Sequence, residues 1–123
     1  MTDEITLTFP RGPDFHPVAH LVLSGLAVRL DLTVESLEDL QLALDALLDQ
    51  TDPGADLGEL TVSMILQDHE LQTRVGPLGR RLLDEIDQEA GDDLSLRRVL
   101  ESTVDDVLVD GDSVRLTKLV ARG

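Results

Sequence analysis

The sequence has 123 residues and carries 25 acidic against 10 basic side chains, which gives a formal net charge of −15 at pH 7. So acidic a chain repels a phosphate backbone, and aromatic residues at only 2% leave little on which bases could stack, so we expect no nucleic-acid binding. Cysteine is absent, which excludes disulfides and thiolate chemistry.

The length is that of one domain, and 41% hydrophobic residues are enough for a core, so we expect a single domain over residues 1–123. The N-terminal MTDEITL lacks the basic and apolar pattern of a signal peptide, and no apolar run reaches the roughly 18 residues of a membrane span. We therefore expect a cytoplasmic protein without membrane contact. The acidity is explained by solubility or, alternatively, by a basic protein partner that the charge attracts.

The spacing of apolar residues predicts, in chain order, a half-buried strand, two helices, a hairpin, two further helices and a closing hairpin. The expected bounds are 4–9 for the strand, 15–30 and 33–50 for the first helices, 60–67 and 70–75 for the hairpin, 80–87 and 94–103 for the later helices, and 104–109 and 114–120 for the closing hairpin. Asp68-His69 and Asp110-Gly111 are the predicted turns. The fold class expected is α+β, a two-layer sandwich of a mostly antiparallel sheet with helices on one face.

The helix at 33–50 has the clearest pattern. Thr33 is a good N-cap residue, and apolar residues at intervals of three and four predict one buried face of Leu37, Leu40, Leu44, Leu47 and Leu48. The helix at 15–30 is expected to bury Phe15, Val18, Ala19, Val22, Leu26 and Leu30. Gly25 lies inside that helix at a cost of about 1 kcal/mol relative to alanine, so we expect close packing there.

Two groups of side chains have the spacing of metal ligands. His16 and His20 are four residues apart on one helix face, which is compatible with zinc, although partly exposed histidines are the more ordinary interpretation. Asp39, Asp45 and Asp49 offer oxygens of the kind that magnesium takes, but such acids are more often the solvated side of an amphipathic helix. The motifs GxxxxGK[ST], GxGxxG and GxSxG do not occur.

Three stretches carry a further signal: ITLTFP, then HLVLSGLAVRL with LTVESLEDLQLALDALLD, and finally LRRVLESTVDDVLVDGDSVRLTKLV. Together with the order of elements, they resemble the small bacterial anti-sigma factors of the RsbW type. These belong to the GHKL superfamily of histidine-kinase-like ATPases, whose fold is the Bergerat sandwich. The resemblance spans nearly the whole chain.

The resemblance implies where the family's functional positions fall. In the family's central helix a glutamate acts as general base and an asparagine four residues later binds Mg²⁺, and these positions are Ala46 and Gln50 here. Ala46 cannot accept a proton, so a kinase or ATPase step has lost its base and no catalytic residue is assigned. Gln50 keeps a carbonyl oxygen, and it is the metal ligand expected if a magnesium nucleotide binds.

Two other nucleotide-binding boxes of the family are altered. The box DxGxG, which approaches the adenine, reads RVGPLGR here, so Gly76 and Gly79 are kept but no aspartate is available. The GLGL box, which covers the phosphates with backbone N–H groups, reads DLSL at 93–96, where Leu94 is the remaining candidate contact. The aspartate of that box faces phosphate with like charge, and two unit charges at ~4 Å repel by about 4 kcal/mol at an effective dielectric near 20.

The resemblance therefore implies an anti-sigma-like regulator of bacterial transcription that acts by protein–protein binding. Binding of ATP or ADP with Mg²⁺ is expected to be weak or absent, and enzymatic activity is not expected. The implied partners are a sigma factor or an anti-anti-sigma protein, and a second copy of the chain. Two alternatives stay open: an active serine kinase of an anti-anti-sigma protein, with Asp45 or Asp49 as the base, and an interaction domain without any nucleotide.

Overall fold

The computed structural model describes residues 3–10, 16–30, 32–50, 59–87 and 96–119. The elements are, in order, β1 (Asp3–Pro10), α1 (His16–Leu30), α2 (Val34–Gln50), β2 (Glu59–Gln67), β3 (Glu70–Gly76), α3 (Arg80–Asp87), α4 (Leu96–Thr103), β4 (Asp106–Asp110) and β5 (Ser113–Leu119). This is the predicted order of strands, helices and hairpins.

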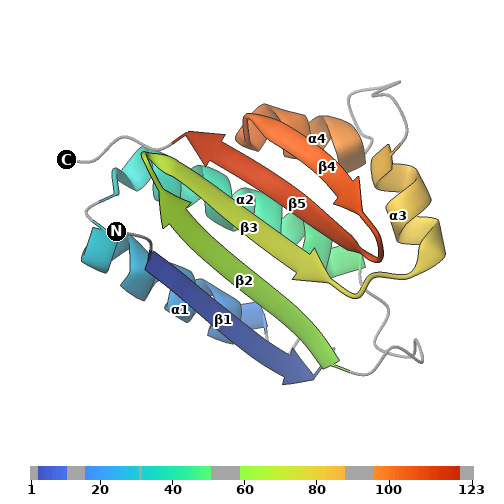
Figure 1. The fold of residues 1–123 in the computed structure, drawn as a ribbon, viewed down its shortest axis with the longest axis horizontal. Coiled ribbons are helices and arrows are strands. Elements are labelled where there is room, and N and C mark those ends of the chain that lie inside the picture. The colour runs from blue at the N-terminus through green and yellow to red at the C-terminus, as the bar shows by residue number, and fades with distance from the viewer. Residues whose placement is uncertain (1–2, 11–15, 31, 51–58, 88–95, 120–123) are drawn as a thin grey trace.

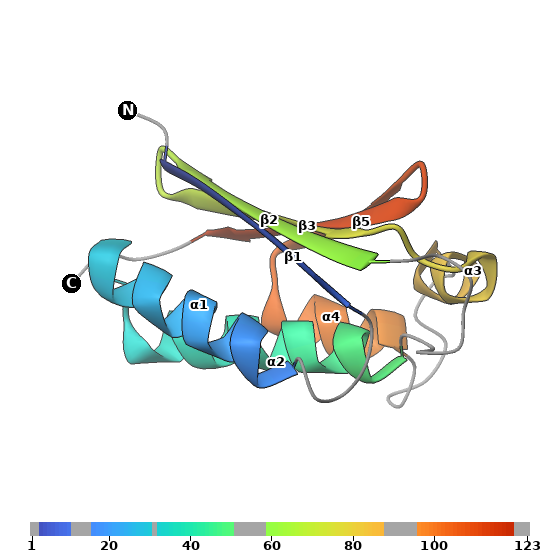
Figure 2. The same ribbon diagram turned by 90° about the horizontal axis from the view of Figure 1, so that it is seen from below.

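The strands form one sheet in the order β1-β2-β3-β5-β4, with every neighbouring pair antiparallel. Figures 1 and 2 show α1, α2 and α4 side by side beneath one face of this sheet, while α3 lies beyond one end of it. The predicted two-layer α+β sandwich is therefore confirmed. Among the described residues, no helix is long and apolar enough to cross a membrane.

The middle hairpin follows from strict alternation in its sequence. In β2 every second residue is buried, from Leu60 to Leu66, and β3 continues this inner face with Leu71, Thr73 and Val75. The predicted turn Asp68-His69 is confirmed, since both residues have positive φ, 53° and 66°, as a tight type I′ hairpin requires.

The closing hairpin differs from the prediction by one residue at its turn. Asp110 pairs with Ser113, so the two turn residues are Gly111 and Asp112 rather than Asp110-Gly111. Gly111 takes φ 65° at the first turn position, where glycine adopts a positive φ at no steric cost. The preceding strand begins at Asp106 rather than at residue 104 because Val104 still donates its N–H to the Leu100 carbonyl oxygen, 3.0 Å away.

Helix α2 forms the centre of the core, as its sequence predicts. The Thr33 hydroxyl accepts the Ser36 backbone N–H at 3.1 Å and caps the helix. Its inward face packs against the sheet through four fully buried leucines and one half-buried leucine, namely Leu40, Leu44, Leu47, Leu48 and Leu37.

Helix α1 departs from its prediction. Leu23, which was not predicted to face inward, is its fully buried residue, whereas Val18 is exposed and Val22 is half-buried. An added Cβ at Gly25 would meet nothing within 4 Å among the described residues, so no described residue provides the close packing expected at Gly25. The helix has almost no amphipathic pattern because apolar residues surround it, so periodicity could not select the buried face. Phe15 and the side chains of Ala19, Leu26 and Leu30 lie outside the described part.

Candidate functional site

The second half of α2 carries Ala46, the residue that the resemblance places at the family's general-base position. Ala46 is half-buried and packs against the core next to the fully buried Leu47 and Leu48. A methyl group at this place donates and accepts no proton. Helix α2 reaches Gln50, but the side chain of Gln50 lies outside the described part, so its role as a magnesium ligand stays a prediction.

The acid beside Ala46 points toward another helix. The Asp45 carboxylate and the His20 ring on α1 form a hydrogen bond, and both side chains are only partly exposed. Since Asp45 is already bonded to α1, it has a structural role that links the two helices. The side chain of Asp49, the second candidate base, lies outside the described part.

The described aspartates of α2 bind different partners on different elements. Asp39 accepts a 3.0 Å hydrogen bond from Lys118 Nζ on β5, while Asp45 faces α1. Among the described residues, no group of three or more His, Asp or Glu side chains is placed to hold a metal ion. The side chain of His16, which belongs to the zinc alternative, is not among them.

The ion pair between Lys118 and Asp39 was not predicted from the sequence. Both residues lie in stretches that resemble the RsbW type. Asp39 is in the first half of α2, and Lys118 is in the last strand, β5. The pair joins residues 79 apart in sequence, and both side chains are largely shielded from solvent. The pair connects α2, the helix that carries Ala46 and Gln50, to strand β5 of the sheet.

The two glycines that match the family's box are the last residue of β3, Gly76, and the residue before α3, Gly79. A Cβ on Gly76 would come within 2.9 Å of Ser113 Cβ on β5 and closer still to the Ser113 hydroxyl. The segment that follows β3 is held against the closing hairpin by a backbone hydrogen bond, in which the Leu78 N–H donates to the Asp112 carbonyl oxygen at 2.7 Å. Gly76 therefore allows β3 to pack closely on the closing hairpin, a role that needs no nucleotide.

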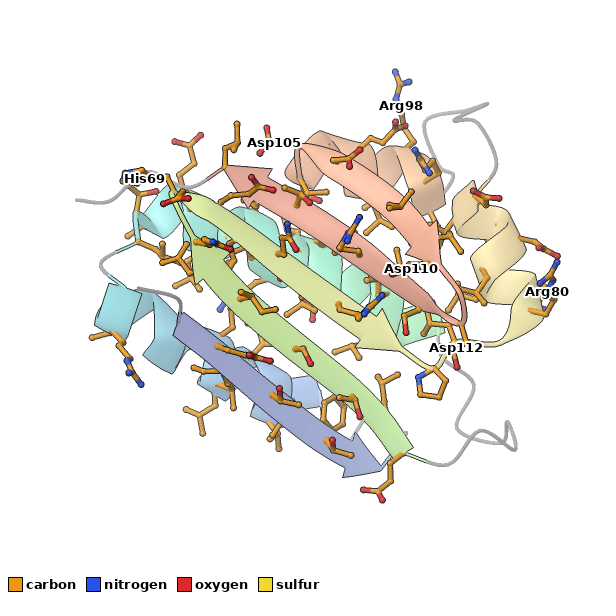
Figure 3. All side chains as sticks on the ribbon, viewed as in Figure 1. His69, Arg80, Arg98, Asp105, Asp110 and Asp112 are labelled. Carbon is orange, nitrogen blue, oxygen red and sulfur yellow. The ribbon has the colours of Figure 1, made fainter. Side chains whose placement is uncertain are left out.

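The other residues of this connection offer apolar side chains. Val75 and Leu78 are both buried in the core, and Gly79 accepts the Leu83 N–H at 3.0 Å as α3 begins. In Figure 3, Asp110 and Asp112 lie at the β4–β5 turn beside this connection, and Asp110 forms an ion pair with Arg74. Sequence patterns gave no sign of these contacts because their partners lie in a distant segment.

Three of the four residues of the phosphate-covering box lie outside the described residues, and Leu96 is the fourth. Residues 88–95 are not described, so Leu94 and the two polar residues that flank it remain predictions. Helix α4 begins at Leu96, whose side chain is buried, and the Arg97 guanidinium donates to the Ile86 carbonyl oxygen of α3 at 2.9 Å. The two helices on either side of the box are thereby joined directly.

Known proteins resemble this chain over most of its length. It is 31% identical over 140 residues to the serine-protein kinase RsbW of Listeria monocytogenes serotype 4a (strain HCC23), covering 98% of this chain and 89% of the relative. The serine-protein kinase RsbW of Listeria innocua serovar 6a is 30% identical with the same coverage. That of Oceanobacillus iheyensis is 29% identical over 94 residues, which is 72% of this chain and 60% of the relative. No protein-family model matches the sequence.

The chain belongs to the RsbW family of anti-sigma factors, within the GHKL superfamily. The antiparallel sheet with helices beneath one face is the fold that this membership implies. The family resemblance drawn from the three sequence stretches is thus confirmed.

Proposed function

We propose that this chain is an anti-sigma-factor-like regulator of bacterial transcription that acts in the cytoplasm, as one domain, by binding protein partners. Its binding of ATP or ADP is weakened or lost. The observation that carries a binding regulator rather than a kinase is Ala46, because a methyl group at the position where the resemblance puts the family's general base cannot accept a proton.

The surroundings of Ala46 support a weakened nucleotide site. The acid next to it is paired with His20 on α1, and Gly76 is required by the contact with Ser113. Arg74 stands two residues before Gly76, where the family's box has the aspartate that bonds the adenine amino group, and its guanidinium, paired with Asp110, cannot accept a hydrogen bond. If the adenine amino group is buried without a hydrogen-bond partner, the affinity for the nucleotide falls, since an unmade hydrogen bond costs about 1 to 3 kcal/mol.

The proposed partners are a sigma factor or an anti-anti-sigma protein, and a second copy of this chain. The net charge of −15 suits a basic surface on the first two, because complementary charge raises the rate of encounter. The whole-length similarity to RsbW proteins supports partners of this class.

Calorimetric titration with ATP and with ADP, each with Mg²⁺, tests the nucleotide part. We expect no heat of binding up to about 1 mM nucleotide, which corresponds to less than about 4 kcal/mol of binding free energy. A dissociation constant in the micromolar range would contradict the proposal. A pull-down in which mass spectrometry identifies a sigma factor tests the partner part and separates it from a purely structural domain.

An active serine kinase is the second candidate, and the relatives named serine-protein kinase favour it. It requires a base other than Ala46, for which Asp45 and Asp49 are the nearest acids. Transfer of radioactive phosphate to an anti-anti-sigma protein that is lost in the variants Asp45→Asn or Asp49→Asn would establish it. Since Asp45 pairs with His20, the variant His20→Ala provides a control for simple loss of the α1–α2 contact.

A further inference from the structure

The face of the sheet that looks away from the helices carries a groove along the middle hairpin. Figure 2 shows α1, α2 and α4 on the other side of the sheet, and no described element covers this face. Two hollows of about 190 and 250 Å³ lie on it, and they meet at Ile65 and Gln72, which line both. We call the two joined hollows the hairpin groove.

One end of the hairpin groove is basic. Arg74 and Arg115 line it and stand directly opposite each other on β3 and β5. Like charges in that position destabilise a sheet unless they are neutralised. Arg74 is paired with Asp110, whereas the half-buried Arg115 has no ion-pair partner among the described side chains. A guanidinium of this kind binds a carboxylate through two parallel N–H···O bonds.

The other end of the groove is acidic. Asp68 and Glu70 line it at the turn between β2 and β3. The Gln72 amide donates a hydrogen bond to the Glu70 carboxylate at 3.2 Å, and Asp68 has no ion-pair partner among the described side chains. Glu4 of β1 adds a third carboxylate to the lining, in the hollow that also contains the arginines. The groove therefore offers binding places for cationic groups as well as for one carboxylate.

The separation of the two ends sets the size of a ligand. Arg74 and Glu70 are four residues apart on β3, which is ~13 Å between their Cα atoms at the rise of a strand. Their side chains and a short ligand can bridge that distance. Ile65 is paired with Gln72, midway between the two ends, and it is the apolar residue of the lining. A matching ligand has a carboxylate at one end, a cation at the other and an aliphatic stem between them.

We propose that the hairpin groove binds a free basic amino acid of the lysine or arginine type. The carboxylate of the ligand pairs with Arg115, and its α-ammonium group pairs with Glu4. The aliphatic stem packs on Ile65, and the cation at the end of the side chain lies at Asp68 and Glu70. A net positive ligand also suits the net charge of −15, because the field of the whole chain attracts it.

A free amino acid fits the groove better than a basic residue within a polypeptide. Peptide bonds remove both the free carboxylate and the free α-ammonium group, so Arg115 and Glu4 would then lose their ionic partners. The inference goes beyond the proposed function. Of the residues in the groove, only Arg74 is also a position of the family's nucleotide site.

An NMR titration of the isotope-labelled full chain with L-lysine, at constant ionic strength, tests the proposal. The backbone amide signals of Ile65, Gln72 and Arg115 should shift and saturate, with a dissociation constant below about 1 mM. Cadaverine lacks the carboxylate and L-norleucine lacks the cation of the side chain. Each should bind at least about tenfold more weakly, because each loses a charge-assisted hydrogen bond. N-acetyl-L-lysine amide, which represents lysine within a polypeptide, should be weakened at least as much.

Two variants with matched controls locate the site. Arg115→Gln should raise the dissociation constant for L-lysine at least about tenfold, and Asp68→Asn at least about threefold because the lost pair is exposed. Asparagine tolerates the positive φ of 53° at residue 68, so this variant keeps its turn. The controls Arg81→Gln and Asp87→Asn make the same changes of charge on exposed residues of α3, and each should shift the constant less than about twofold.

Three results would overturn the proposal. The first is a dissociation constant for L-lysine above about 1 mM. The second is equally tight binding of cadaverine or of the capped lysine, since the groove would then recognise a diamine or a polypeptide. The third is unchanged binding in Arg115→Gln, which would place the ligand elsewhere. These results are independent of the nucleotide titration, because neither Arg115 nor Asp68 is one of the family's nucleotide positions.

Discussion

Helices α1 and α2 lie side by side under the same sheet, yet their sequences obey different rules. Helix α2 has a capped start, one leucine face in the core and acids that pair with neighbouring elements. Helix α1 buries Leu23 but leaves Leu21 and Val28 in solvent. The chain's own core accounts for most of the apolar residues of α2, although Val34 and Leu42 are exposed, whereas three apolar residues of α1 (Val18, Leu21 and Val28) are exposed.

Gly76 and Gly25 differ in the same way, in what a Cβ atom added to each would contact. Gly76 is kept because a Cβ there would collide with Ser113, while a Cβ on Gly25 would meet open space among the described residues. Neither observation involves a nucleotide, although Gly76 lies in the stretch where the family approaches its adenine. The retention of a glycine is therefore weak evidence that a nucleotide site is retained.

The sharpest test of the difference between the helices compares two leucines. Leu47→Ala in α2 removes a fully buried side chain, so the free energy of unfolding should fall by about 2 to 5 kcal/mol. Leu21→Ala in α1, measured by urea denaturation at a concentration where the chain is monomeric, should change it by less than about 0.5 kcal/mol. Comparable losses for the two variants would mean that α1 buries more of its surface than this structure places there.

The second test concerns the glycine that packing requires. Gly76→Ala should lower the free energy of unfolding by about 1 to 3 kcal/mol, because the new methyl group overlaps the Ser113 side chain. The double variant with Ser113→Gly removes that side chain and should recover part of the loss. If Gly76→Ala is neutral, the contact between β3 and the closing hairpin is looser than described, and Gly76 becomes available for another role.

The sequence predicted an element well where the residues that determine it are close together in the chain. The bounds of α2 and the middle hairpin could be predicted because their spacing and turn residues lie within a few positions of each other. The buried face of α1 could not, because a helix that is apolar all round carries no periodic signal. The turn of the closing hairpin was displaced by one residue because Gly111 takes the first turn position rather than the second.

The candidate site itself stays a prediction. The family frame places it on α2 and around the end of β3, and the relatives confirm the family. The contact between Gly76 and Ser113, and the pairing of Lys118 with Asp39, could not be predicted because they join segments far apart in the chain. The nucleotide roles of Gln50, Gly79 and Leu94 stay predictions.

The smallest expected effect has the opposite sign. Gly25→Ala should raise the free energy of unfolding of the monomer by about 0.5 to 1 kcal/mol, because alanine restricts the unfolded chain and the added methyl group meets nothing in the described structure. Thermal and urea unfolding at concentrations where the chain is monomeric measure this gain, with Gly76→Ala as the matched loss. A destabilised Gly25→Ala monomer would show that some part of the same chain packs against Gly25. The glycine would then be explained by packing within the chain, as Gly76 is by its contact with Ser113.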